Sequence, residues 1–148
     1  MKCNAKSVFV SVLLAVFSQV VLANSYEEYK VKIEECIAVE EQKAPLTVSD
    51  VSALSVDELE KYVLLLKDIR IQRCSAVEEL AALADEISSS ESVVSKLMEQ
   101  RYLSVYLEAQ MHNLSAEDKL KLTELDNRLE KKGLEVNMLD IVDELKNQ

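Results

Sequence analysis

The stretch LLLKDIRIQRC (residues 64–74) lies in the middle of the longest helical pattern of the chain and decides how its helices pack. Apolar residues recur at three- and four-residue spacing on both sides of it, which is typical of a helix face that packs on a core. The expected face consists of Leu59, Val63, Leu66, position 70, position 73, Val77, Leu80, Ala84 and Ile87. Positions 70 and 73 are both arginine, and Cys74 follows at once. The fold must therefore accommodate two guanidinium groups beside a cysteine.

The first 23 residues have the layout of a secretory signal peptide. Lys2 and Lys6 precede an apolar run from Val8 to Leu22, and residues 21–23 (VLA) have the small residues of a cleavage site. The run is shorter than the roughly 20 apolar residues that a bilayer-spanning helix needs. We predict cleavage after Ala23, with an uncleaved membrane anchor as the alternative. The protein is then exported, to the periplasm in a bacterium and otherwise to the outside of the cell.

Residues 24–148 are expected to form a single domain. Loss of Lys2 and Lys6 lowers the net charge from −10 to −12. Such an acidic chain suits neither nucleic acid, whose binding depends on Lys and Arg, nor an anionic membrane surface. We therefore expect no nucleic-acid partner and no membrane insertion after cleavage. With one glycine and one proline in the chain, a Gly-rich phosphate loop and a nucleophile elbow are excluded.

Two cysteines, Cys36 and Cys74, remain after the signal peptide and its Cys3 are removed. An even pair in an exported chain predicts a disulfide, with two free thiols or a metal-binding pair as alternatives. Closing this loop would stabilise the fold by roughly 4 kcal/mol in the chain-entropy model.

Capping residues and breaks divide the chain into helices. Ser25-x-x-Glu28 and Ser55-x-x-Glu58 have the spacing of capping boxes, and the first helix must end before Pro45. Gly133 is expected as a left-handed helix cap. The expected helices span about 25–43, 47–54, 55–87, 91–112, 115–132 and 137–145. The predicted fold is all-α, a small bundle of four to six helices in which the disulfide ties the first helix to the long one.

The disulfide also predicts a register. If the two helices are antiparallel and Cys36 faces Cys74, then Glu40 faces Arg70, and Arg73 can reach Glu40 or Glu41. We interpret these residues as structural ion pairs, because an arginine stem packs on apolar neighbours while its guanidinium binds carboxylates. A solvated helix face and an anion-binding site are the alternatives.

The same register leaves the N-terminal part of the long helix beyond the end of the first one. This overhang includes the apolar residues 63–66 and needs a cover. The linker supplies suitable side chains, namely Leu46, Val48, Val51 and Leu54.

Candidate catalytic and metal-binding residues are few. His112 is the only histidine, so neither a histidine-based zinc site nor a Ser-His-Asp triad is available, and no EF-hand loop occurs. We interpret Tyr102 and Tyr106 as packing residues, and Asn113 as a glycosylation acceptor only in a eukaryote. The acidic pairs 27–28, 34–35 and 40–41 are expected on solvated helix faces. We therefore predict no catalytic residue, no cofactor, no metal site and no enzymatic activity.

Two similar segments, Leu54-Ser-Val-Asp-Glu58 and Leu114-Ser-Ala-Glu-Asp118, each open a predicted helix. With the long hairpin expected between them, they resemble the periplasmic LTxxQ-motif family of helical chaperones and stress or metal sensors. Over residues 54–129 the resemblance implies a dimeric cradle for partners. Serine stands for the motif threonine at 55 and 115, and Glu58 and Asp118 stand for the motif glutamine.

By elimination, the sequence predicts an exported interaction protein without catalytic activity, of the inhibitor, immunity or adaptor type. Its expected partner is a protein, and a homodimer is among the options. An LTxxQ-like chaperone or stress sensor is one alternative. A carrier of an apolar small ligand is another, because the long helix and the next are apolar over much of their circumference.

Overall fold

The computed structural model describes residues 24–89, 95–134 and 138–147, so the predicted signal peptide lies outside the described residues. Within these ranges the all-α prediction is confirmed. The helices are α1 (Ser25–Glu41), α2 (Val48–Val51), α3 (Val56–Ser89), α4 (Ser95–Arg101), α5 (Leu103–His112), α6 (Ala116–Arg128) and α7 (Met138–Lys146). A two-residue parallel pair, β1 (Ala44–Pro45) with β2 (Lys132–Gly133), is added to them.

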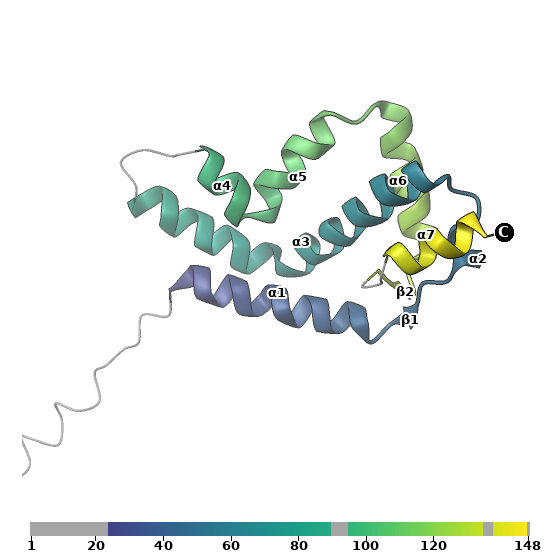
Figure 1. The fold of residues 1–148 in the computed structure, drawn as a ribbon. Coiled ribbons are helices and arrows are strands. Elements are labelled where there is room, and N and C mark those ends of the chain that lie inside the picture. The colour runs from purple at the N-terminus through teal and green to yellow at the C-terminus, as the bar shows by residue number, and fades with distance from the viewer. Residues whose placement is uncertain (1–23, 90–94, 135–137, 148) are drawn as a thin grey trace, which may run out of the picture.

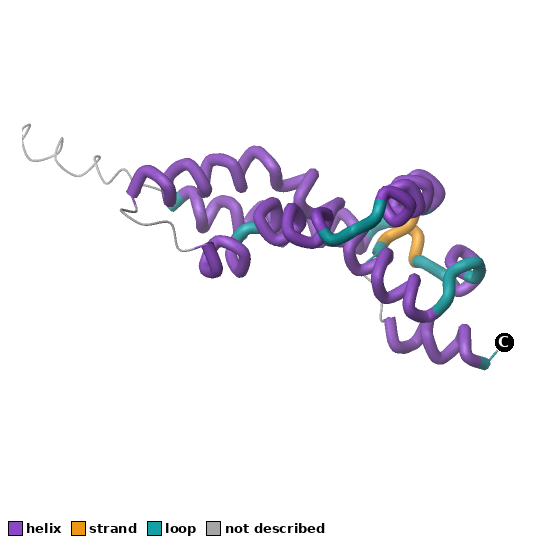
Figure 2. Tube along the Cα trace, turned by 90° about the horizontal axis from the view of Figure 1, so that it is seen from above, coloured by secondary structure: helices purple, strands orange, loops and turns teal. Residues whose placement is uncertain are grey.

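The helix α3 is the axis of an elongated molecule (Figures 1 and 2). Its 34 residues extend over about 50 Å at 1.5 Å per residue. In Figure 1, α1 lies along one side of α3, and α4 and α5 lie along another. The helices α2, α6 and α7 lie together beside the N-terminal part of α3, at the end of the molecule away from α4.

The predicted disulfide is present and sets the register of α1 against α3. Cys36 and Cys74 are bonded, with their Cα atoms 6.0 Å apart. At one end of the helix pair, Ser25 Oγ donates a hydrogen bond to Asp85 (2.6 Å). At the other end, Glu40 lies 3.5 Å from Arg70. All three contacts belong to the single antiparallel register that the two cysteines predict.

Two apolar clusters lie along α3. The larger one surrounds its N-terminal half and contains the linker residues that we expected as a cover for the overhang. Its fully buried members include Val51, Leu59, Val63, Leu66 and Leu129. The smaller cluster is built on Tyr29, Ala82 and Tyr102, where α1, α3 and α5 meet. Burial of these side chains supplies most of the driving force for folding.

The predicted apolar stripe of α3 is buried only in its first half. Beyond Arg70 the buried positions are Ile71, Ser75, Glu79 and Ala82, whereas Val77 and Leu80 are 78% and 68% exposed. Leu59 and Val77 are 18 residues apart, which is five full turns of 3.6 residues, so they point to the same side of α3. Leu59 is 0% exposed because the larger cluster covers this side of the N-terminal half of α3. In the C-terminal half, α3 packs against α1 and α5 with other sides, so the stripe is exposed there and our prediction was wrong for that half.

The helix expected over residues 91–112 is interrupted at Tyr102, which has an extended backbone. Side chains of other helices accept hydrogen bonds from the backbone N–H groups that follow. Leu103 N–H donates to the Tyr29 hydroxyl (3.1 Å), and Ser104 N–H donates to Glu79 (2.7 Å). These acceptors stabilise the start of α5, since the first N–H groups of a helix have no partner within it.

Two predicted caps differ in the structure. Asn24, not Ser25, caps α1 and accepts a hydrogen bond from Tyr26 N–H (3.1 Å). Gly133 is not a left-handed cap, because no glycine among the described residues has a positive φ. It lies in β2, where a Cβ atom would overlap the carbonyl oxygen of Glu40. Close approach of two backbones is therefore the reason for glycine at this position.

We expect Gly133→Ala to lower the free energy of unfolding by about 1–3 kcal/mol, because the added methyl group forces β2 away from the end of α1. The exposed neighbour Lys131 is the control, and Lys131→Ala should change stability by less than about 0.5 kcal/mol. Urea unfolding followed by circular dichroism measures both values. Wild-type stability of Gly133→Ala would contradict the close approach.

Candidate interaction surface

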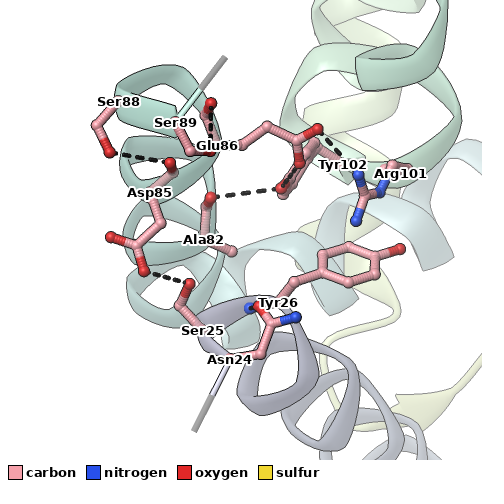
Figure 3. Close-up of a pocket in the computed structure, with 10 residues that line it drawn as sticks. All are labelled: Asn24, Ser25, Tyr26, Ala82, Asp85, Glu86, Ser88, Ser89, Arg101 and Tyr102. Carbon is pink, nitrogen blue, oxygen red and sulfur yellow. Dashed lines mark hydrogen bonds and ion pairs between the residues drawn. The ribbon is translucent and has the colours of Figure 1, made fainter. Parts of the chain in front are cut away.

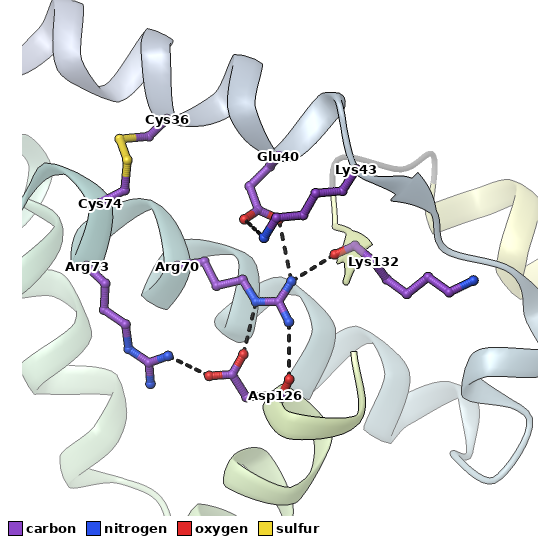
Figure 4. A network of polar contacts seen from close by, with 8 residues as sticks. All are labelled: Cys36, Glu40, Lys43, Arg70, Arg73, Cys74, Asp126 and Lys132. Atoms are coloured by element: carbon purple, nitrogen blue, oxygen red, sulfur yellow. Dashed lines mark hydrogen bonds and ion pairs between the residues drawn. A yellow bond between two sulfur atoms is a disulfide. The ribbon is translucent and has the colours of Figure 1, made fainter. Parts of the chain in front are cut away.

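The buried side chain of Arg70 joins four elements of the fold (Figure 4). Its Nε donates to Asp126 Oδ1 (3.0 Å), and its Nη2 donates to the Asp126 carbonyl oxygen (3.3 Å). Its Nη1 donates to the Lys132 carbonyl oxygen (2.8 Å) and lies 3.5 Å from Glu40. The side chain is 8% exposed, so these protein acceptors replace the water that a guanidinium otherwise binds.

Each carboxylate that binds Arg70 also binds a second cation. Glu40 also pairs with Lys43, and Asp126 also pairs with Arg73. Burial alone would raise the pKa of Asp126, but hydrogen bonds from Arg73 and Arg70 outweigh it and hold that pKa below its usual value. Because the donors of Arg70 point at protein acceptors, the geometry supports the structural interpretation over an anion-binding site.

The partner of Arg73 differs from our prediction. Arg73 binds Asp126 of α6 rather than Glu40 or Glu41, and its side chain is 62% exposed. Glu41 is also exposed, at the end of α1. The disulfide register placed α1 correctly, but it carried no information on α6, which occupies the side of α3 that Arg73 faces.

We expect Arg70→Gln to lower the free energy of unfolding by about 3 kcal/mol, because it leaves buried carboxylate and carbonyl groups without their donor. Arg73→Gln is a matched control on the same helix, with the same partner. Its exposed ion pair should contribute less than about 1 kcal/mol. Chemical denaturation of both variants makes the comparison, and equal losses would contradict the central place of Arg70.

A second buried polar group, Glu79, was not found from the sequence. It is 1% exposed and accepts hydrogen bonds from the Tyr29 hydroxyl (3.1 Å), Ser104 N–H (2.7 Å) and Gln72 (3.2 Å). Burial raises the pKa of the Tyr29 phenol, so the hydroxyl keeps its proton and donates it. In the sequence Glu79 follows another glutamate, a pattern that indicates a solvated face.

Aromatic and charged side chains from α1, α3 and α4 surround a cleft of about 490 Å³ (Figure 3). The guanidinium of Arg101 lies 4.0 Å from the ring centroid of Tyr26 and 2.9 Å from Glu86. The Tyr102 hydroxyl donates to Glu86 (2.6 Å), and burial raises its pKa. Arg101 and Tyr102 thus both bind Glu86, an arrangement suited to joining α3 to α4.

The two similar segments lie side by side, and each one caps its own helix. Ser55 and Ser115 each exchange hydrogen bonds with the acidic residue three positions later. Glu58 then pairs with Lys121, and Asp118 pairs with Lys61. Each acid thus binds the lysine that follows the other cap, and the repeat joins the start of α3 to the start of α6.

An apolar face of α3 is exposed to solvent. We define the α3 outer face as Val77, Leu80, Ala81, Ala84 and Ile87, all of them exposed. Val77, Leu80 and Ile87 are 78%, 68% and 54% exposed.

The acids near this face point elsewhere. Glu79 is buried, Asp85 accepts the hydrogen bond of Ser25, and Glu86 binds Arg101. Glu78 lies one heptad before Asp85, so it shares the side of α3 that faces α1. The outer face is consequently uncharged over three helical turns, in a chain with a net charge of −10.

Three other residues singled out from the sequence differ in their exposure. His112 is exposed in the last turn of α5, and Tyr106 is partly exposed, whereas Tyr102 is buried. In the described ranges no group of three or more His, Cys, Asp or Glu side chains is placed to hold a metal ion. Nor does any helix in these ranges have the length and apolar character to cross a membrane.

No family model, curated protein or solved structure matches this chain. The resemblance to the LTxxQ-motif family therefore stays a prediction. Within the fold, the serine and acidic residues of the two motifs cap the starts of α3 and α6.

Proposed function

We propose that this is an exported interaction protein without catalytic activity, which binds a protein helix through the α3 outer face. The observation that carries the proposal is the uncharged, exposed apolar stripe formed by Val77, Leu80, Ala84 and Ile87. Single exposed apolar residues are common on soluble proteins, but contiguous apolar patches mark interaction sites.

The spacing of this stripe indicates the shape of the partner. Its residues follow one another at three- and four-residue steps, which is the spacing of a coiled-coil seam. Ala81 and Ala84 lie between the large side chains and let a second helix approach closely. A helix that presents its own apolar stripe fits such a surface better than a strand or a loop does.

Export is supported by the signal-peptide layout of residues 1–23 and by the Cys36–Cys74 disulfide. Disulfides persist in oxidising compartments, which the periplasm and the outside of the cell provide. The acidic remainder of the surface favours solubility, and binding of the inhibitor, immunity or adaptor type rests on the uncharged outer face.

A carrier of an apolar small ligand is the second candidate. A cleft of about 470 Å³ lies between α1, α3, α4 and α5. Its lining includes the apolar Ile33, Ile37, Ile71 and Leu103 together with charged residues such as Lys67, Glu99 and Arg101. A carrier would retain an apolar ligand during purification, which native mass spectrometry of the protein detects.

We expect a photo-crosslinking amino acid, p-benzoylphenylalanine, placed at position 80 to give a covalent adduct with a protein in the cells that produce this chain. The control is position 120, where Leu120 is 59% exposed on α6, close to the 68% of Leu80. Adducts are separated by size and identified by mass spectrometry. Adducts of equal yield at both positions, or none at position 80, would contradict the proposal.

A further inference from the structure

The α3 outer face is complementary to itself. When two helices pack antiparallel, residue numbers increase in opposite directions along them. A residue before the centre of one helix therefore contacts a residue after the centre of the other. Centring such a pair between Leu80 and Ala84 places Val77 opposite the partner's Ile87, and Leu80 opposite the partner's Ala84. The same pairs recur on the other side of the centre, as a two-fold axis requires.

We propose that the partner bound by the α3 outer face is a second copy of this chain, with its α3 antiparallel to the first. The inference rests on the proposed function and specifies the partner. The heptad assignment supports it, since Val77 and Ala84 occupy a positions and Leu80 and Ile87 occupy d positions. In an antiparallel pair each layer then joins an a residue to a d residue.

Side-chain volumes favour the antiparallel arrangement over a parallel one. Each Leu80 packs on the small side chain of the partner's Ala84, so large and small residues interdigitate between the helices. In a parallel pair Leu80 would meet the partner's Leu80, and Ala84 would meet the partner's Ala84. The alanine layer would leave a gap beside a crowded leucine layer, which is poor packing for both.

Charge is the main obstacle to association of two acidic chains, and the outer face avoids it locally. Its contact positions carry no charge, and the nearby acids Asp85 and Glu86 bind Ser25 and Arg101 of their own chain. The repulsion that remains acts over longer distances between exposed acids and is screened by salt. The dimer should therefore strengthen as the NaCl concentration rises, whereas an interface held by ion pairs would weaken.

The size of the face determines the kind of dimer. From Val77 to Ile87 the seam is about 15 Å long at 1.5 Å per residue. A contact of this length falls at the small end of specific interfaces, where transient complexes are found. The expected dimer therefore forms and dissociates reversibly, and its population depends on concentration.

Sedimentation equilibrium of the purified exported protein tests the association. The average mass should rise with protein concentration and with NaCl. Leu80→Glu should remove the rise, because it places a charge at the centre of the seam. Leu120→Glu is the control, with the same substitution at a similarly exposed position, and should dimerise like the wild type. A monomer at all concentrations and salt levels would overturn the inference.

Cysteine cross-linking tests the orientation. A mixture of Val77→Cys and Ile87→Cys chains should be joined by a short bismaleimide reagent. Val77→Cys alone should not be joined, because its two copies lie about 15 Å apart along the helix axis. Efficient self-linking of Val77→Cys, without linking in the mixture, would overturn the antiparallel arrangement.

The results also separate this inference from the proposed function. A photo-adduct of position 80 with a different protein, together with a monomeric purified chain, would overturn the homodimer and leave the binding function in place. Failure of both the photo-adduct and the dimer would remove both proposals.

Discussion

The buried guanidinium group of Arg70 needs hydrogen-bond acceptors, and the rest of this structure depends on that constraint. A charged group can leave water only if protein atoms take over its hydrogen bonds. Arg70 binds Asp126 of α6, the carbonyl oxygen of Lys132 in β2 and Glu40 at the end of α1. These acceptors come from three separate parts of the chain, so its burial fixes their positions together.

The other features near Arg70 follow from this meeting point. Glu40 of α1 and Lys132 of β2 both bind this guanidinium. Their backbones therefore lie so close together that a side chain at position 133 would overlap the Glu40 carbonyl. The Cys36–Cys74 disulfide fixes the register of α1 one turn away. Arg70 also marks the place where the buried side of α3 changes, from Val63 and Leu66 before it to Ser75 and Glu79 after it.

This change of side links the fold to the proposed function. The heptad stripe of α3 serves the core in its first half and faces solvent in its second half, where α1 and α5 pack on other sides of the helix. A coiled-coil seam is thereby left without a partner within the described part of the chain. The proposed binding function and the antiparallel dimer both use this seam.

Local patterns predicted the helices, the disulfide and the contact between Glu40 and Arg70, because these depend on capping, periodicity and a single register. The place of Asp126 could not be predicted, since nothing local relates α6 to α3. The break at Tyr102 and the burial of Glu79 depend on each other through the N–H of Ser104, a contact between distant segments. Gly133 was predicted to be a left-handed helix cap, which is a common role of glycine. The nearby carbonyl oxygen of Glu40, in a distant segment, is the reason for glycine at this position.

Native-state hydrogen exchange of Arg70→Gln, compared with the wild type, tests the central place of Arg70 most directly. The account predicts that amide protection falls most in α6 and β2, which depend on Arg70 for their position. Protection in α1 and in α3 around Cys74 should persist, because the disulfide and the Tyr29 cluster hold those helices together. A uniform loss of protection across all helices, or unchanged protection in α6, would contradict it.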